Sequence, residues 1–543
     1  MFQSAFTAML VGCACVTSAL AQTNNAAKLP NFAEVEAAGA TIGSVSIRID
    51  DVFDTTQTKE DKPLFRLANR LHINTRQSVI KSQLLFRSGD VFRQSLIEES
   101  ARLLRRNKFF YDATIQLVRF ENNVADIVVS ARDNWTLLPE LALSRTGGNT
   151  RYRYGVEEDN LFGTGSAITI ARGEDENRSS LDFLFSNRNV GRSWVGLDLR
   201  YRDSDDGEAS RLRLVRPFFA LGTRWSAGFD VFSDDREDPL FSLGDEVGRF
   251  RHEEQGAAAW FGWSKGLVDN WATRWSVGFV MSDNQFAPPD AVSDFIVVPA
   301  ERDLRYPYVR YERIENRFAV ANNLNNIALT EDIYLGTRFS LTLGVLSDSF
   351  NADRNGAIVD GQVQTSRGDP AQSLLSLRAG LSGRVESGDV ANARFGASAT
   401  YYRRQSPQRV FYARLSGVAG HELDLDQLLE FGGDTGLRGY PRAFGNGESR
   451  ALLTIEQRFY TDWYPLRLFR VGAAAFVDVG RIWGSDATGF RDDRVLADAG
   501  VGLRLSSTRG NSNRVVHIDL AFPLQSDPNV DSVQVLVEVR RSF

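Results

Sequence analysis

The sequence predicts a mainly β protein, in which one small N-terminal α+β domain precedes a 16-stranded antiparallel transmembrane β-barrel. Three observations predict this fold class. The chain opens with a segment that has the composition of a secretory signal. From Trp135 to Phe543, apolar and polar residues alternate with the two-residue period of strands. No segment after the signal-like one holds 18 consecutive apolar residues, so a transmembrane helix is not expected. Without such a helix, only a closed barrel pairs every backbone group inside a membrane.

The length of 543 residues allows more than one domain, and the charges nearly balance. Lys and Arg number 63 against 69 Asp and Glu, a formal net charge of −6. A balance of this kind gives no reason for a nucleic-acid partner, and we expect none.

Residues 1–21 are predicted to be a signal peptide. The segment is apolar and small, and its end at Ser18–Ala21 is typical of a cleavage site. Two alternatives stay open. One is a buried N-terminal helix, and the other is lipoprotein processing at Cys13, because Leu10–Cys13 is similar to a lipobox.

Both cysteines, Cys13 and Cys15, fall inside this segment, so its removal leaves no thiol for a disulfide, a metal site or a nucleophile. The histidines show no metal-ligand spacing and no H-E-x-x-H frame. They are His72, His252, His421 and His517. We therefore expect no cofactor, no bound metal and no catalytic residue.

Residues 22–40 are predicted to be a linker, and residues 41–133 a compact mixed domain. Alternation predicts a first strand around Val45–Ile49, and helical spacing predicts two helices after Thr75. Two strands follow at about 112–120 and 124–132, with Asn122-Asn123 as the turn between them. The order is strand, helix, helix, strand, strand. The pattern assigns no role to residues 51–74.

Residues 134–543 are predicted to form the barrel. The clearest alternation runs from Ile333 to Val345, with apolar residues at every second position. A soluble sandwich would alternate too, but the length of this region, the signal segment and the terminal Phe543 favour a barrel.

Counting such runs gives about 18 strands, and the alternation of short turns with long loops reduces the prediction to 16. The stretch 314–331 fits poorly, because its position should make it a short turn. Long loops are expected near residues 233–250, 284–301, 347–373, 421–449 and 483–494.

The last strand is predicted over residues 531–543, with an apolar face that ends on an aromatic residue. The residues that carry this pattern are Val535, Val537, Val539 and Phe543. The pattern resembles the β-signal that the barrel-assembly machinery reads, and an exposed strand edge of this kind can pair with a template strand. The alternative is an ordinary closing strand.

Two further motifs lie 40 residues apart. The first is Gly432–Tyr440, in a predicted outer loop, and the second is the strand segment Phe476-Val477-Asp478-Val479-Gly480. Together with the Asn160–Gly165 segment they resemble the motif set of the BamA/TamA-type superfamily of barrel assembly factors and secretion transporters. The 41–133 region resembles that superfamily's POTRA domain, in particular through Leu84–Asp90 and Leu103–Phe110.

The resemblance implies a loop that folds back into the lumen. Its tip would be Leu437, Arg438, Gly439 and Tyr440, and its partner strand would present Phe476, Asp478 and Gly480. Arg438 would pair with Asp478, which shares the lumenal face because lipid exposure of a carboxylate is very costly. The alternative is a solvated hairpin in which the two residues are unrelated.

The resemblance also implies a function. The protein would insert polypeptides into the bacterial outer membrane or move them across it, with the POTRA-like domain in the periplasm. Its partners would be outer-membrane lipids, unfolded or partly folded polypeptides, and the barrel-assembly machinery for its own insertion. A dedicated two-partner-type secretion pore, a passive channel and an outer-membrane enzyme are the alternatives. The acidic stretches near residues 203–206, 234–238 and 492–493 are expected to be solvated loop tips rather than calcium or lipopolysaccharide sites.

Overall fold

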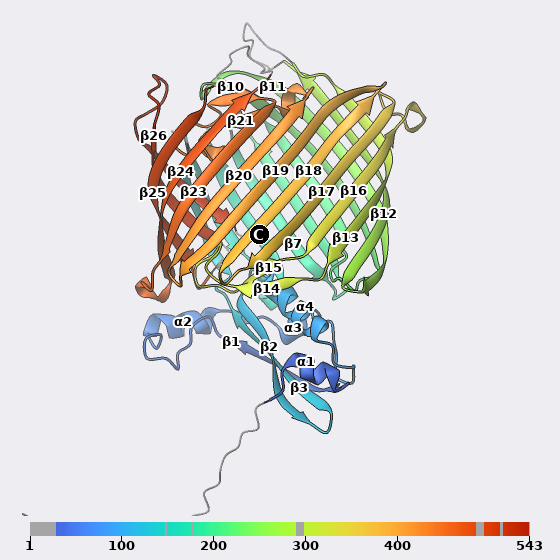
Figure 1. The fold of residues 1–543 in the computed structure, drawn as a ribbon, viewed down its shortest axis with the longest axis vertical. Coiled ribbons are helices and arrows are strands. Elements are labelled where there is room, and N and C mark those ends of the chain that lie inside the picture. Colours follow the sequence, from blue (N-terminus) through green and yellow to red (C-terminus); the bar gives the residue numbers. More distant parts are fainter. Residues whose placement is uncertain are drawn as a thin grey trace, which may run out of the picture.

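Two parts of unequal size lie against each other in the computed structural model (Figure 1). The larger is a barrel of tilted strands, and the smaller is an α+β domain at one end of the barrel. We call this end of the barrel the domain end and the opposite end the far end. The structure describes residues 29–146, 149–175, 177–288, 298–484, 494–510 and 514–541; the predicted signal peptide with Cys13 and Cys15, and Phe543, lie outside the described residues.

The small domain contains a three-stranded sheet in the order β1-β3-β2. β1 (Thr41–Asp50) pairs in parallel with β3 (Val124–Asp133), and β2 (Phe110–Glu121) pairs antiparallel to β3. The helices α3 (Gln77–Lys81) and α4 (Gln94–Arg105) contribute side chains to the same core. Its most deeply buried members include Ile42, Ile80, Phe92, Ile97, Leu104 and Ile127. No described helix is long and apolar enough to cross a membrane.

The segment predicted as a linker is structured where it is described. A six-residue helix, α1 (Phe32–Ala37), replaces the expected tether. Asn31 and Glu34 form a capping box, in which each side chain accepts the other's backbone N–H at 2.9 Å. Val35 is fully buried in the core of the small domain. The helix escaped prediction because two turns are too short to show a periodic pattern.

Residues 51–74, which had no predicted role, form a contact with the domain end of the barrel. They include α2 (Pro63–Leu71). Arg509, in a turn between barrel strands, donates to the carbonyl of Val52 at 2.6 Å and forms a short, buried ion pair with Glu60. This segment therefore joins the small domain to the barrel.

The barrel has 20 strands, so the predicted number of 16 is wrong. Neighbouring strands are antiparallel, and the last strand lies beside the first to close the ring. In chain order the strands are β4 (Leu137–Thr146), β5 (Asn149–Glu158), β6 (Ser166–Glu174), β7 (Ser179–Val190), β8 (Val195–Ser204), β9 (Gly207–Arg216), β10 (Trp225–Ser242), β11 (Asp245–Val268), β12 (Trp271–Ala287), β13 (Arg302–Glu315), β16 (Thr337–Leu346), β17 (Gly356–Asp369), β18 (Ser373–Glu386), β19 (Asp389–Ser406), β20 (Arg409–His421), β23 (Ser449–Tyr460), β24 (Phe469–Trp483), β25 (Leu496–Ser507), β26 (Arg514–Pro523) and β27 (Gln534–Arg541).

Two predicted loops contain strand residues. Residues 233–250 form the paired ends of β10 and β11, as far as Ser242 with Asp245. The predicted loop at residues 347–373 contains a complete strand, β17, which the predicted number omits. The acidic residues of the first stretch form cross-strand ion pairs instead of a solvated tip. Arg249 contacts Glu237 at 3.0 Å, for example. The strand continues past the apolar band with polar residues, and this polar composition led to the prediction of a loop.

Alternation along the strands divides the barrel wall into two faces. Large apolar side chains such as Leu343, Phe395 and Leu415 are exposed on the outer face, as a lipid-facing surface requires. The long alternating run predicted from Ile333 is interrupted, since the short strand β15 (Glu331–Tyr334) ends before β16 begins. Ile333 therefore does not belong to the barrel wall.

Candidate functional site

The long segment between β20 and β23, residues 421–449, is the structure's largest departure from a simple barrel, and we call it the lumenal loop. It carries two three-residue strands, β21 (Leu429–Phe431) and β22 (Gly445–Gly447), which pair with each other. Its apolar residues pack with side chains of the barrel wall. This cluster comprises Phe431, Leu437, Tyr440, Phe444, Ile482 and Leu496. The loop thus folds back into the lumen at the far end, near β21 in Figure 1.

Arg438, at the tip of the lumenal loop, is 2 % exposed and lies among carboxylates of the wall. Its Nε and Nη2 donate to the two oxygens of Asp478 at 2.7 and 3.1 Å. Its Nη1 donates to Glu456 at 2.9 Å and to Asp519 at 3.3 Å. A bidentate pair of this kind fixes orientation as well as distance.

Residues of β24 and of the neighbouring strand hold Asp478 in place as the partner of Arg438. Phe476, two residues before Asp478 on the same face, places its ring centroid 3.3 Å from the guanidinium carbon. Thr454 of the neighbouring strand donates to Asp478 at 2.7 Å. Asp478 is fully buried, so these donors compensate its removal from water.

Glycines allow the loop to approach the wall closely. The backbone N–H of Gly439 donates to Asp498 at 2.9 Å, and a Cβ at this position would lie only 2.5 Å from the Cβ of Asp498. At Gly480 a Cβ would lie 2.4 Å from the ring of Phe431. The Tyr440 hydroxyl donates to the carbonyl of Ala497 at 3.2 Å. Each of these three positions therefore faces the loop–wall contact.

The sequence did not identify three further acidic residues of this site: Glu456, Asp498 and Asp519. All three occupy inward positions on strands near β24, and Asp498 lies directly opposite Asp478. The available signal was their presence in predicted spanning strands, since a carboxylate there must face the lumen. Across the described ranges, no group of three or more His, Cys, Asp or Glu side chains has an arrangement that could hold a metal ion.

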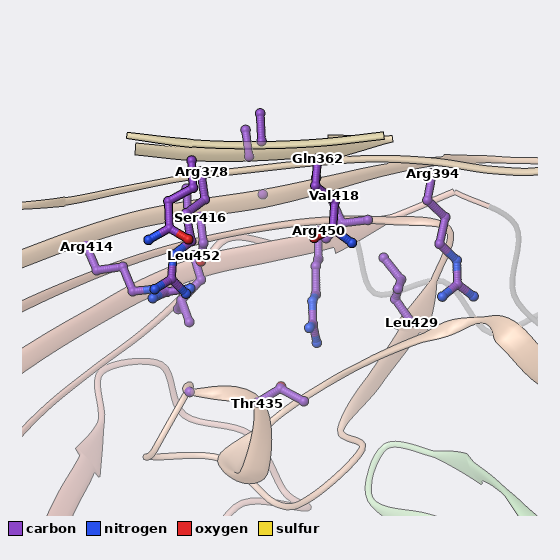
Figure 2. Close-up of a pocket in the computed structure, with 18 of the residues that line it drawn as sticks. Gln362, Arg378, Arg394, Arg414, Ser416, Val418, Leu429, Thr435, Arg450 and Leu452 are labelled. Carbon is purple, nitrogen blue, oxygen red and sulfur yellow. The ribbon is translucent and has the colours of Figure 1, made fainter. Parts of the chain in front are cut away.

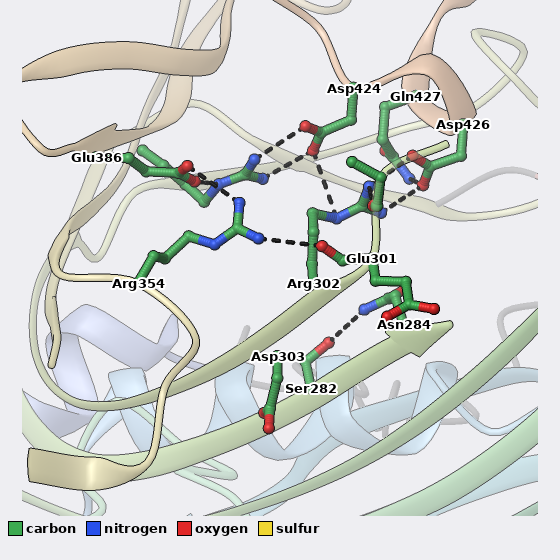
Figure 3. A network of polar contacts seen from close by, with 12 residues as sticks. Ser282, Asn284, Glu301, Arg302, Asp303, Arg354, Glu386, Asp424, Asp426 and Gln427 are labelled. Atoms are coloured by element: carbon green, nitrogen blue, oxygen red, sulfur yellow. Dashed lines mark hydrogen bonds and ion pairs between the residues drawn. The ribbon is translucent and has the colours of Figure 1, made fainter. Parts of the chain in front are cut away.

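The base of the lumenal loop is attached separately (Figure 3). Arg302 of β13 donates two bonds to Asp426 at 2.9 and 2.7 Å. Arg384 of β18 donates two bonds to Asp424 at 2.8 and 2.9 Å. The loop is thus held at its base by wall arginines and at its tip by wall carboxylates.

A second segment occupies the lumen at the domain end. Residues 316–336, which we call the plug hairpin, include β14 (Phe318–Ala321) paired with β15. Its tip residues Leu324 and Ile327 are buried against wall residues such as Tyr402 and Tyr460. This is the stretch that fitted the predicted strand phase poorly. The alternation of short turns and long loops predicts a short turn at this end of the barrel, whereas the observed connection has 21 residues.

The small domain contacts the plug hairpin through its charged residues. Arg105 of α4 donates two bonds to Asp332 at 2.8 and 2.5 Å. Thr330 donates to Asp112 of β2 at 2.9 Å. The hairpin is therefore held between the barrel wall and the small domain.

The predicted early-barrel segment, Asn160–Gly165, forms another contact with the small domain. The Asn160 side chain donates to the hydroxyl of Thr75 at 2.7 Å, and the carbonyl of Gly163 accepts from the N–H of Arg76 at 3.0 Å. Gly163 has a φ of +70°, and a Cβ there would lie 2.4 Å from the carbonyl oxygen of Asn74. The segment is a docking turn.

The predicted terminal motif lies on the closing strand β27. Val535 and Val539 are exposed on its outer face, and Val537 pairs with Arg145 of β4. β27 is matched with β26 over eight pairs, and on its other side it lies beside β4 and closes the ring.

The fold and the site define a transmembrane β-barrel whose own loop occupies its lumen. A family model described as the Omp85 superfamily domain matches residues 160–537, which is more than half of the chain. The chain belongs to the Omp85 superfamily, and the superfamily predicted from its motifs is confirmed. Membership implies a location in the outer membrane.

Several solved structures are similar to the chain at low identity. BamA from Haemophilus ducreyi lacking POTRA domains 1–3 is 13% identical with a TM-score of 0.39, over 91% of this chain and 84% of that one. CdiB from Acinetobacter baumannii is 11% identical with a TM-score of 0.47, over 92% and 73%. CdiB from Escherichia coli is 12% identical with a TM-score of 0.49, over 92% and 76%. No curated protein matches the chain.

Proposed function

We propose that this protein inserts polypeptides into the outer membrane or translocates them across it, and that the lumenal loop sets its resting state. The observation that carries the proposal is the contact of Arg438 with Asp478 inside an Omp85-superfamily barrel. Burying an ion pair costs desolvation energy that its attraction barely offsets, so such a pair is better suited to specifying one conformation than to adding stability.

The small domain would lie in the periplasm and receive the unfolded chain. Its observed order is α1-β1-α2-α3-α4-β2-β3, and the part β1-α3-α4-β2-β3 follows the strand–helix–helix–strand–strand order that supports the POTRA-like assignment. Both β1 and β2 are edge strands of its sheet, because β3 lies between them. An extended polypeptide could add to such an edge through backbone hydrogen bonds, which are largely independent of its sequence.

The barrel would then open at the seam between β27 and β4. The seam joins the last and first strands of the barrel, which no turn connects, so these two strands can separate while the other neighbouring strands stay linked along the chain. The outer-face residues Val535, Val537 and Val539 would belong to the strand that templates the incoming one. The mechanism makes and breaks hydrogen bonds only.

A dedicated secretion pore remains the second candidate, because polar side chains such as Ser340, Gln362 and Ser416 line the larger cavity of the lumen. Deletion of residues 23–132 separates a passive channel from a device that handles polypeptides. A simple pore keeps its conductance in planar bilayers after the deletion, whereas a secretion or insertion device loses its substrate.

The direct test replaces Arg438 by Ala in the full-length protein reconstituted in liposomes. The probe is a urea-unfolded outer-membrane barrel whose folding is followed by heat-modifiable mobility in gels. We expect the folding rate of the probe to fall by roughly tenfold or more, because removal of one partner from a buried pair costs about 3–5 kcal/mol of loop anchoring.

The control variant is Arg403→Ala, the same replacement on the outer face of β19. It should fold and work as the unaltered protein does. If Arg438→Ala leaves folding, stability and probe insertion unchanged, the proposed function of the lumenal loop is wrong.

A further inference from the structure

The lumen between the lumenal loop and the plug hairpin contains two cavities that share one section of wall. The first has a volume of about 1020 Å³ and lies under the lumenal loop. The second has a volume of about 410 Å³ and lies against the plug hairpin. Both are lined by the inner faces of β17–β20. The residues common to the two linings are Gln364, Arg378, Ser398, Tyr412 and Arg414.

Arginines descend this wall in steps. Four successive inward positions of β20, from the far end toward the domain end, either have an arginine in the same row across the sheet or are an arginine themselves. These rows are Gly420 with Arg394, Val418 with Arg450, Ser416 with Arg378, and Arg414 itself. Inward positions on a strand are about 7 Å apart, so the series follows the route from one cavity to the other. Figure 2 shows the four side chains on the wall above Thr435 of the lumenal loop.

The two arginines at the junction of the cavities have no carboxylate partner. Arg378 and Arg414 are exposed to the lumen, and neither forms an ion pair with any described residue. Arg394 and Arg450 instead donate to backbone carbonyls of the lumenal loop, those of Gln427 and Glu430. The guanidinium groups at the junction are therefore free to take an external anion.

The carboxylates of the larger cavity do not neutralise this wall. Six arginines and four acidic residues line it. Glu456 is bonded to Arg438, and Asp434 is bonded to Arg442 within the lumenal loop. Asp360 lies opposite Ser382, four residues along β17 from the residue that faces Arg378, and Glu538 lies on β27, outside the wall formed by β17–β20. The cavity as a whole carries an excess of positive charge.

We propose that Arg378 and Arg414 form a binding site for acidic segments of the polypeptide that the protein handles. Carboxylates match the fork of a guanidinium group, so each arginine can hold a carboxylate through two hydrogen bonds. Small residues between the arginines, Gly380, Gly396 and Ser416, leave the wall open to an extended backbone. A volume near 1,000 Å³ equals that of the largest small-molecule pockets, so it accommodates a short peptide segment.

The proposal of this binding site rests on the proposed function, and it specifies that the polypeptide substrate contains acidic segments. An extended acidic peptide is the occupant that the site favours, because the guanidinium groups of Arg378 and Arg414 match carboxylates and lie along a wall of strands that an extended backbone can follow. Acidic stretches would be retained on the wall while neutral ones pass.

The test measures binding of a fluorescent peptide of alternating Glu and Ser to the full-length protein in detergent. Matched peptides of alternating Lys and Ser, and of Ser alone, are measured beside it. The measurement is made in the unaltered protein and in an Arg105→Ala background, so that a closed plug hairpin cannot hide the site. We expect the acidic peptide to bind tightest and its affinity to fall as salt is raised.

The double variant R378Q/R414Q should bind the acidic peptide roughly tenfold more weakly or worse, since each charge-assisted hydrogen bond contributes about that factor. The control R403Q removes a guanidinium from the outer face of β19 and should bind normally. Equal binding by R378Q/R414Q, no preference for the acidic peptide in either background, or displacement by lipid A but not by peptide would overturn the proposal.

The two proposals fail in different ways. If the reconstituted protein inserts a urea-unfolded barrel but shows no preference for the acidic peptide, the binding site is wrong and the function stands. If the acidic peptide binds through Arg378 and Arg414 but no polypeptide is inserted or transported, the site stands and the function is wrong.

Discussion

Gly439 and Arg438 depend on each other. The guanidinium of Arg438 reaches Asp478 because the backbone of Gly439 lies directly against Asp498, with an N–H to carboxylate distance of 2.9 Å. A side chain at Gly439 would occupy the position of the Asp498 side chain. In this motif, Arg438 binds the carboxylates of the wall, and Gly439 has no side chain and so lets the loop backbone approach the wall.

Asp159 is a single residue whose protonation affects how the small domain and the barrel are joined. It lies in the turn after β5, it is 5 % exposed, and Lys108 of the small domain is 3.5 Å away. Burial raises the pKa of Asp159 to about 6 from an ordinary value of 3.8. Because the folded-state pKa is the higher one, this group stabilises the fold fully below about pH 4, and that contribution is lost as the pH rises through about 6.

We therefore expect Asp159→Asn to reduce the pH dependence of stability between pH 4 and pH 7. The full effect is about 3 kcal/mol at the conversion of ~1.4 kcal/mol per pH unit of pKa difference. The measurement is the unfolding temperature in detergent across this range. Asp205→Asn, in an exposed turn, serves as the control, and an unchanged slope in Asp159→Asn would contradict the assignment.

At the scale of elements, the plug hairpin connects the barrel lumen to the small domain through direct contacts. The hairpin tip is packed on the wall, and its base is bonded to Arg105 and Asp112. The Arg105–Asp332 pair is partly buried and bidentate, so it contributes more than an exposed pair would. A polypeptide that binds the small domain and shifts α4 would pull on this pair.

Replacing Arg105 by Ala should loosen the hairpin without unfolding the barrel. Loss of a charged pair of this kind costs about 1.5–3 kcal/mol, so amide hydrogen exchange in residues 318–334 should accelerate by roughly tenfold or more. The neighbouring Arg106→Ala, which removes an exposed side chain of the same type, is the control. Equal exchange in the two variants would show that the small domain does not hold the hairpin.

At the scale of the whole molecule, the seam and the segment 51–74 lie close together. Trp135, directly before β4, packs on the cluster formed by Val52, Phe53 and Phe65 of that segment. The first barrel strand is therefore attached to the small domain at the end where the seam begins. Movement of the small domain would reach the seam through this contact.

Cross-linking the seam tests whether it opens. Cysteines at Arg145 and Val537, which face each other across β4 and β27, should form a disulfide under oxidation, since paired strand positions have a suitable Cα separation. We expect the oxidised variant to lose insertion of an unfolded barrel and to regain it on reduction.

The control pair is Val516 and Val539, which face each other across β26 and β27. A disulfide there fixes a junction that the mechanism leaves closed, so activity should persist. Full activity of the oxidised seam variant would rule out opening between β27 and β4.

Local patterns in the sequence were enough for much of this fold. Alternation marked the barrel because lipid and lumen demand opposite polarity at successive residues of a strand. The resemblance of the motifs implied that Arg438 pairs with Asp478, and the polarity of a spanning strand predicted only that Asp478 faces the lumen. The helices and strands after Thr75 also lie close to their predicted positions, since each has a clear period.

The number of strands, the plug hairpin and the acidic partners of Arg438 were decided by tertiary structure. Acidic residues in β10 and β11 are paired across strands, and a composition alone does not distinguish a paired charge from a solvated one. Leu324 and Ile327 are buried only because distant wall residues surround them. Within a strand of the wall, the sequence by itself determined which residues face lipid, since that depends on the neighbours of each residue along the strand. Which segments fill the lumen depends on contacts between residues hundreds of positions apart, and only the folded chain brings these together.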